Sequence, residues 1–269
     1  MQMSHKGPFI HGYTELVSRS GSTSDMMMSF GVLALTKGEV HHDPTGSGEE
    51  RIWLLSGGGA TITWGGESQE IGRSDLLNAE PWVLSVPSSV EVTIEAGSEG
   101  AEFYRCATDN QTQFASHLYT PSECKSEFRG EGMMNETSTR IVRTVFDDTN
   151  RPQSNLVIGE VIGVPGKWSS YPPHHHRQPE IYHYRVFPSQ GFGMCLIGET
   201  PHVIHDKDTI LIHEGEVHPH VAAPGYALWY LWVIRHIEND RYGIQTVPPQ
   251  YQWVTAPDAQ IWEPKKDSY

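Results

Sequence analysis

Three histidines and one glutamate in the middle of the chain have the residue types and spacing of a metal site. They are His174, His176, Glu180 and His218. Residues two apart on an extended strand point to the same side, so His174 and His176 share a face. A histidine run can also be inert or part of a purification tag, but a tag sits at a terminus and this run is central. The sequence therefore predicts one divalent metal ion bound by these four residues.

The expected ligands leave open positions on a metal that accepts further ligands. Imidazole and carboxylate suit Zn, Mn, Fe and Ni without choosing among them, and we take zinc as the leading candidate. Such an ion polarises a carbonyl and its neighbouring hydroxyl together, so that a base can move a proton through a cis-enediol and convert an aldose to a ketose. The candidate catalytic residues are Glu180, Tyr182, Tyr184 and Tyr171. Each tyrosine equally suits the aromatic wall of a barrel, so spacing does not identify the base.

An acidic substrate also needs a positively charged partner in the protein. The nearby candidates in the sequence are Lys167, Arg129, Arg140 and Arg185. Arg185 is expected to face away from the pocket, because it alternates with Tyr182 and Tyr184 along one strand. Tyr230 and Trp232 suit either the pocket floor or the core.

Short apolar segments separated by turn residues predict that the elements around these residues are β-strands. The chain contains 26 glycines and 18 prolines, which favours a turn-rich β protein over a helical one. The expected strands are residues 30–36, 52–55, 60–64, 83–86, 90–94, 101–107, 140–146, 156–164, 182–187, 193–197, 209–212 and 228–234. Residues 108–135 read as a linker that includes a helix-compatible segment at 121–128, and the tail from Gln245 is expected to wrap around a barrel.

A weak internal repeat indicates that the chain contains two copies of one fold. Leu35–Gly38 precedes His41 and His42 much as residues 163–166 precede His174 and His176. The first copy lacks the chemistry, because adjacent histidines cannot share one face of a strand. We expect an all-β chain with two tandem domains, 1–118 without metal ligands and 119–269 with the metal site.

Composition limits the partners and the compartment. The net charge is −14, which argues against binding to nucleic acid. No apolar run reaches the length of a membrane span, and no hydrophobic signal segment is visible, so we expect no membrane partner. Three cysteines without a paired spacing read as reduced thiols, which favours the cytoplasm. A small-molecule partner fits these limits, and a homo-oligomer is compatible with them.

The motif around the histidines resembles the cupin pattern. Gly166 is followed by His174-x-His176, then Glu180, and later by Gly215-x-x-His218. The wider phrases resemble the 5-deoxy-glucuronate isomerase family of inositol degradation, whose members are tandem cupins. These phrases are Trp168-Ser-Ser-Tyr-Pro-Pro-His174, Tyr182-His-Tyr184, Gln190-Gly-Phe192, Ala223-Pro-Gly-Tyr226 and Tyr230-Leu-Trp-Val233. The chain departs from the family pattern at His175, Arg177 and His213, which bears on the substrate more than on the metal.

The resemblance implies a fold and a reaction. The fold would be two jelly-roll barrels of the cupin type. The reaction would convert 5-deoxy-glucuronate to 5-dehydro-2-deoxy-gluconate in the degradation of myo-inositol, so the partner would be a small-molecule sugar acid. Two alternatives use the same features. One is a cupin dioxygenase with the same three-histidine, one-glutamate site, and the other is a sugar-binding bicupin without turnover.

Overall fold

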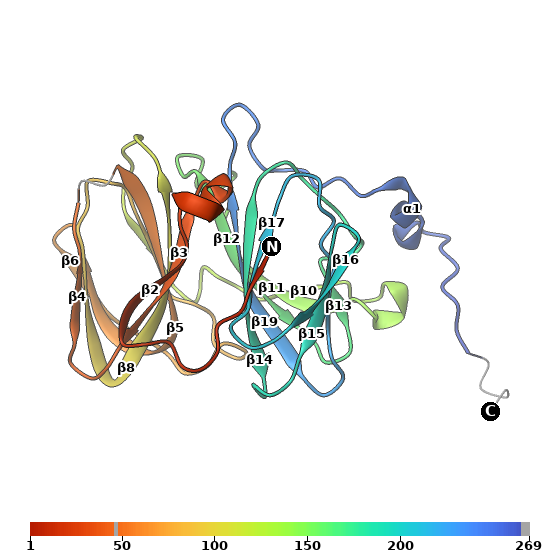
Figure 1. Cartoon of the computed structure of the whole chain (residues 1–269), viewed down its shortest axis with the longest axis horizontal. Helices are drawn as coiled ribbons and strands as arrows, with labels where there is room; N and C mark the ends of the chain where they lie inside the picture. Colours follow the sequence, from red (N-terminus) through yellow and green to blue (C-terminus); the bar gives the residue numbers. More distant parts are fainter. Residues whose placement is uncertain (46–47, 265–269) are drawn as a thin grey trace.

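The computed structural model describes residues 1–45 and 48–264 of the 269-residue chain. Almost all of its regular structure is β-strand, as the sequence predicts. Figure 1 shows two β-barrels side by side, the first drawn in red to yellow and the second in green to blue. We refer to residues 12–119 as the first barrel and to residues 127–235 as the second barrel.

The first barrel is built on one eight-stranded antiparallel sheet. Its main path is β2-β3-β8-β5-β7-β9, with β4 beside β8 and β6 beside β5. The strands are β2 (Gly12–Val17), β3 (Ser29–Leu35), β4 (Val40–Asp43), β5 (Glu49–Trp64), β6 (Glu67–Arg73), β7 (Val83–Val86), β8 (Val92–Asp109) and β9 (His117–Tyr119).

Two pairs of predicted strands are each one long strand in the structure. Segments 52–55 and 60–64 are both part of β5, and segments 90–94 and 101–107 are mostly part of β8. The expected break at Gly57–Gly59 is instead a pair of register shifts between β5 and β8. Gly58 has a positive φ of 79°, which glycine adopts without strain, so the strand bends there and continues.

The second barrel has a seven-stranded and a four-stranded sheet. The larger sheet has the order β1-β17-β14-β19-β12-β11-β10, and the smaller has the order β13-β18-β15-β16. The strands are β1 (Gln2–Met3), β10 (Glu127–Arg129), β11 (Arg140–Phe146), β12 (Leu156–Gly163), β13 (Trp168–Ser169), β14 (Glu180–Phe187), β15 (Gly193–Ile197), β16 (Thr200–Ile204), β17 (Thr209–Ile212), β18 (His220–Ala222) and β19 (Ala227–Arg235).

The two large sheets repeat the same strand order. β2-β3-β8-β5-β7-β9 of the first barrel corresponds to β11-β12-β19-β14-β17-β1 of the second. The outermost strand of the second barrel, β1, comes from the start of the chain and pairs with β17. The division between residues 118 and 119 stays a prediction, and residues 2–3 pair with β17, which lies beyond it.

Helical structure is sparse in the described residues. The helix-compatible segment 121–128 is not a helix, because its first residues form turns and its last begin β10. The tail does not wrap around a barrel as expected. It forms the short helix α1 (Pro249–Gln252) and then leads away from the second barrel, as Figure 1 shows. None of the described helices is long and apolar enough to cross a membrane.

Side chains that alternate along a strand of the larger sheet pack into two different apolar clusters, one inside the second barrel and one between the barrels. On β14, Tyr182 and Tyr184 point into the second barrel, where they join an apolar cluster with residues of the four-stranded sheet. Ile181 points the other way, into a cluster formed with the outer face of the first barrel. The larger sheet of the second barrel is therefore buried on both faces, which gives the strands that carry the site a rigid support.

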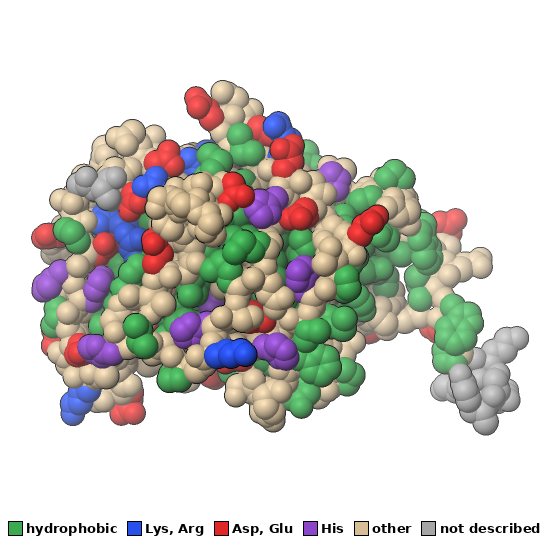
Figure 2. Space-filling model, in the orientation of Figure 1, with side chains coloured by type: hydrophobic (Ala, Val, Ile, Leu, Met, Phe, Trp, Pro, Cys, Tyr) green, Lys and Arg blue, Asp and Glu red, His purple; other side chains and the backbone are tan. Residues whose placement is uncertain are grey.

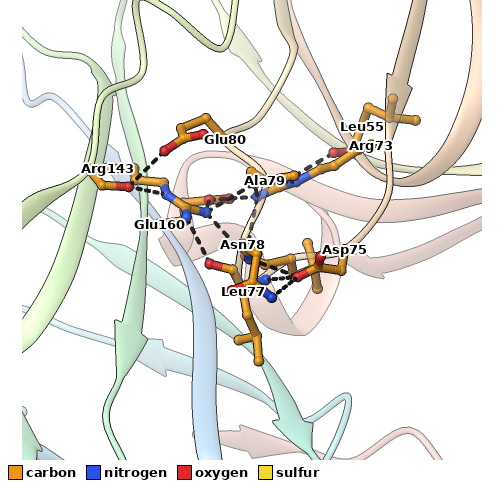
Figure 3. Close-up of polar contacts among 11 residues, drawn as sticks. Leu55, Arg73, Asp75, Leu77, Asn78, Ala79, Glu80, Arg143 and Glu160 are labelled. Atoms are coloured by element: carbon orange, nitrogen blue, oxygen red, sulfur yellow. Dashed lines mark hydrogen bonds and ion pairs between the residues drawn. The ribbon is translucent and has the colours of Figure 1, made fainter.

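Polar groups also join the two barrels, as Figure 3 shows for one buried cluster. Arg73 of β6 and Arg143 of β11 both donate to Glu160 Oε1 of β12, at 2.6 and 2.7 Å. Arg143 also donates to the carbonyls of Leu77 and Ala79. Since the side chain of Glu160 is fully buried, these partners satisfy a charge that would otherwise be costly inside the protein.

The surface is mixed in character. Figure 2 shows acidic, basic and histidine side chains scattered over one face, with hydrophobic side chains gathered over the second barrel and the C-terminal segment. Large exposed hydrophobic residues include Phe192 and Met194 near β15 and Trp253 and Trp262 in the tail. The three cysteines are free and buried.

Candidate metal centre

The predicted ligands come from two loops and the start of one strand of the second barrel. His174 and His176 lie in the extended loop before β14, Glu180 is the first residue of β14, and His218 precedes β18. The loop is not a strand, but His175 forms an isolated bridge with Thr246. This backbone bridge pairs the middle histidine with the tail, and His175 is not one of the residues whose donor atoms group together.

Three of the four residues form a compact group of donor atoms. One ligand atom from each of His176, Glu180 and His218 lies within 4.8 Å of the others. Glu180 Oε2 is 3.1 Å from His176 Nε2 and 3.4 Å from His218 Nε2. The ring of His174 is centred 4.8 Å from that of His218, so the fourth residue lies beside the group.

Backbone carbonyls determine which nitrogen each histidine presents to the centre. Nδ1 of His174 is 2.9 Å from the Pro172 carbonyl, Nδ1 of His176 is 2.9 Å from the Gln178 carbonyl, and Nδ1 of His218 is 2.8 Å from the Glu216 carbonyl. A carbonyl can only accept, so each Nδ1 carries the proton and each Nε2 keeps a lone pair. Such outer hydrogen bonds orient imidazole ligands for metal binding.

This arrangement brings together atoms that all accept hydrogen bonds. The Nε2 lone pairs of His176 and His218 face a carboxylate oxygen, and the buried His218 Nε2 has no hydrogen-bond partner among the described residues. Buried acceptors that face one another are unfavourable unless a cation lies among them. The group therefore fits a divalent metal ion and could hold one.

Burial keeps two of the imidazoles in the neutral form that suits a metal. It lowers the pKa of His174 to about 4 and that of His218 well below its ordinary value, so both imidazoles are neutral at neutral pH. Burial raises the pKa of Glu180. Neutral imidazole is the form that binds metals.

A cavity of about 530 Å³ opens beside this group within the second barrel. Its lining includes His174, Glu180, Tyr182, Tyr230 and Trp232. Tyr230 and Trp232 were expected in either the pocket or the core, and they serve both, since they also pack in the apolar cluster of the barrel. A cavity of this size suits a small molecule.

The three candidate catalytic tyrosines lie in different surroundings. Tyr182 lines the cavity, and its hydroxyl is 3.2 Å from the hydroxyl of Ser170. Tyr184 is not part of the lining, and its hydroxyl lies 2.5 Å from His220 Nε2 in the barrel interior. Tyr171 packs against Trp168, with ring centres 5.8 Å apart, and does not line the cavity. Tyr182 is thus the candidate that can reach a bound molecule.

Sequence reasoning missed Tyr242, which also lines the cavity. Its ring is centred 4.9 Å from that of His176, and its hydroxyl accepts a hydrogen bond from Gln245. Burial raises the pKa of Tyr242 to about 12. Tyr242 lies on an irregular segment after the last strand, where no periodic pattern indicates which way a side chain points.

The four positively charged residues that the sequence suggested as substrate partners lie in different places. Arg140 and Arg129 line the cavity, whereas Lys167 does not. Arg185 lies on the outer side of β14, as its strand position predicted, where it pairs with Asp206 at 2.9 Å and with Glu102 of the first barrel at 3.3 Å. The cavity therefore has a positive side provided by β10 and β11.

Two barrels with the same strand order, one of which carries a histidine and glutamate centre, define a tandem cupin. The fold comparisons agree with this class. A cupin 2 conserved barrel domain protein from Leptotrichia buccalis matches with a TM-score of 0.52 at 12% identity, covering 85% of this chain and 91% of that chain.

The chain belongs to the KduI/IolB family, whose model matches residues 4–254. A 5-deoxy-glucuronate isomerase from Geobacillus thermodenitrificans is 30% identical over 251 residues, spanning 84% of this chain and 86% of the relative. The crystal structure of an IolB-like protein from Salmonella typhimurium LT2 has a TM-score of 0.76 at 23% identity, covering 85% of this chain and 90% of that chain. The chain is an isomerase of this family.

Proposed function

We propose that this protein is a metal-dependent aldose–ketose isomerase of a deoxy-uronate. Its substrate would be 5-deoxy-glucuronate and its product 5-dehydro-2-deoxy-gluconate, in the degradation of myo-inositol. The Geobacillus relative is named for its action on 5-deoxy-glucuronate, and this similarity supports the substrate. The observation that carries the proposal is the buried group of facing acceptors beside a sugar-sized cavity.

In this proposal His174, His176, Glu180 and His218 hold one divalent ion, with zinc as the leading candidate and Mn, Fe or Ni as alternatives. A bound ion with open positions would supply Lewis-acid polarisation of a carbonyl and its neighbouring hydroxyl. The carbonyl partners of the three Nδ1 atoms hold the imidazole rings in the orientation that this requires.

The remaining work is proton transfer by groups that line the cavity. Isomerisation moves one proton from carbon 2 to carbon 1 of the sugar and one from the oxygen of carbon 2 to that of carbon 1. We assign the carbon proton to Glu180, because burial raises its pKa and makes it a stronger base. Burial raises the pKa of Tyr182 well above its ordinary value, so it stays protonated and can exchange the oxygen proton.

NMR of product formed in heavy water tests the reaction. Proton transfer through the protein predicts that solvent deuterium enters the new hydroxymethyl carbon of the product. Product without solvent deuterium would indicate a hydride shift and contradict the roles of Glu180 and Tyr182. Equal rates with and without oxygen are expected, and a requirement for oxygen would favour the dioxygenase alternative instead.

Absence of turnover in metal-loaded protein would contradict the isomerase proposal for this substrate. Elemental analysis of the same preparation identifies the ion and its stoichiometry. One ion per chain is expected, and a preparation that binds none after reconstitution with each of the four metals would contradict the metal centre.

A further inference from the structure

Arg140 is a half-buried arginine whose side chain faces the cavity. It is the first residue of β11 and shares a face with Val142 and Thr144, which also line the cavity. Arg143, at the opposite parity, points toward the first barrel, where it pairs with Glu160 at 2.7 Å. Strand alternation thus gives these two arginines different environments, one with a carboxylate and one beside the cavity.

The guanidinium of Arg140 has donors to spare. Its one protein hydrogen bond among the described residues goes from Nη1 to the Ser138 carbonyl at 3.0 Å. No carboxylate of the described residues lies within ion-pair distance of it, although the chain carries an excess of acidic residues. A guanidinium has five N–H donors in a planar fork that matches a carboxylate, so most of this capacity is unused.

A second arginine lies directly opposite Arg140 on the neighbouring strand. Arg129 of β10 is its register partner, and both line the cavity. Like charges directly opposite on neighbouring strands repel, so the pair costs free energy unless an anion lies between or beside them. Arg129 has one carboxylate partner, the exposed Glu127 two residues away, at 3.0 Å.

We propose that Arg140, with Arg129 at its side, is the subsite that binds the carboxylate of the sugar acid. This inference rests on the proposed function and deepens it, because it says how the site selects a uronate over a neutral aldose. The aldehyde end of the substrate lies toward His174 and Glu180, and the acid end lies toward β10 and β11. A bidentate contact between guanidinium and carboxylate fixes the direction in which the sugar enters.

Paired kinetics on two substrates test the subsite. The first substrate is 5-deoxy-glucuronate, and the second is the same aldose with a hydroxymethyl group in place of the carboxylate. Arg140→Met should raise KM for the acid by about 100-fold and change kcat by only a few-fold, because the positively charged partner of the carboxylate is lost. For the neutral aldose, wild type and Arg140→Met should be equal.

Two further variants separate charge from structure. Arg140→Lys should recover part of the affinity for the acid, because it keeps the charge but not the planar fork. Lys167→Met is the matched control, since it removes a positive charge from the same barrel without touching the cavity lining, and it should leave KM unchanged. If Arg140→Met does not fold, Arg140→Gln takes its place in the comparison.

A binding titration distinguishes failure of the subsite from failure of the proposed function. D-Glucuronate and D-glucose are titrated calorimetrically into metal-loaded wild type and Arg140→Met. Glucuronate that binds wild type more tightly than glucose, and loses that preference in the variant, supports the subsite even in a protein without turnover. Equal binding of both sugars to both proteins, or an equal KM for the acid with and without Arg140, would overturn it.

Discussion

The same position of the large sheet carries a glutamate in the second barrel and an arginine in the first. Glu180 lies opposite the last residue of β17, and Arg51 lies opposite the last residue of β7, which holds the same place in the strand order. Both side chains are buried. One barrel therefore places a negative group at this point of the fold, and the other places a positive group.

The surroundings of Arg51 follow from its charge. Its guanidinium donates to Asp43 at 3.3 Å and to the carbonyls of Pro44 at 2.7 Å, Pro87 at 3.3 Å and Val90. In the second barrel the corresponding region gathers acceptors of His176, Glu180 and His218, and no lysine or arginine of the described residues pairs with this glutamate. The comparison teaches that the same scaffold can hold a cationic side chain at this position in one barrel. In the other barrel it can hold a group of acceptors that fits a metal ion.

The next inward-facing position on the same two strands also differs between the barrels. Tyr182 lies opposite Ile210 of β17, and Trp53 lies opposite Leu84 of β7. Tyr182 borders the cavity, whereas Trp53 is fully buried, with the ring of His41 centred 5.5 Å away. Packing fills the first barrel where the second leaves space for a small molecule.

The largest effect that separates the barrels should come from removing a histidine. His218→Ala should reduce bound metal from one ion per chain to almost none and abolish isomerase activity, because the proposed ligand atom Nε2 of His218 is lost. The double variant His41→Ala, His42→Ala should keep its metal and its activity within a few-fold. Elemental analysis with a rate assay measures both. Loss of metal from the double variant would make the barrels equivalent and break the comparison.

A smaller but still large effect is expected at the next inward-facing position of the same strand, Tyr182. Tyr182→Phe should lower kcat by about 100- to 10,000-fold, the range for loss of a positioned proton-transfer group. Trp53→Phe, the corresponding change in the first barrel, should leave kcat per folded molecule unchanged. Steady-state kinetics on metal-loaded variants checks both. Equal kcat for Tyr182→Phe and wild type would remove Tyr182 from the reaction.

The smallest effect concerns stability without metal, and it should have opposite signs in the two barrels. Arg51→Met should lower the free energy of unfolding by about 3 kcal/mol, because it removes the buried cation that bonds to Asp43 and to the carbonyls of Pro44 and Val90. Glu180→Gln should raise it, since burial raises the pKa of Glu180 and the ionised form therefore costs stability above its unfolded pKa. Urea unfolding at pH 7 with a chelator measures both variants. A shift of the same sign in both would show that the positions are equivalent.

Local patterns could be predicted from the sequence, and long-range placement could not. His174, His176 and Glu180 are close along the chain, so their spacing alone indicates a shared site. The position of Tyr242 depends on how the irregular segment after β19 returns to the barrel, and this segment has no periodic pattern from which its course could be predicted. The correspondence between Arg51 and Glu180 is visible only from strand pairing, because no sequence motif marks Arg51.

The strand boundaries show a similar limit. Glycines at 57–59 read as the end of a strand, yet β5 continues through them as a bend. A glycine run is compatible with both outcomes, and the partner strand decides between them. Likewise, nothing in residues 1–3 indicates that they pair with β17, because β pairing is set by contacts far away in the sequence.

The pairing of β1 with β17 has a consequence for how the chain is synthesised. Met1 donates to the carbonyl of Leu211, and these residues are 210 positions apart. At about 5 to 20 residues per second, β1 leaves the ribosome roughly 10 to 40 seconds before its partner exists. Residues 2–3 therefore remain without this partner while the first barrel forms, and the sheet that carries the candidate metal centre gains this edge strand only after β17 has emerged.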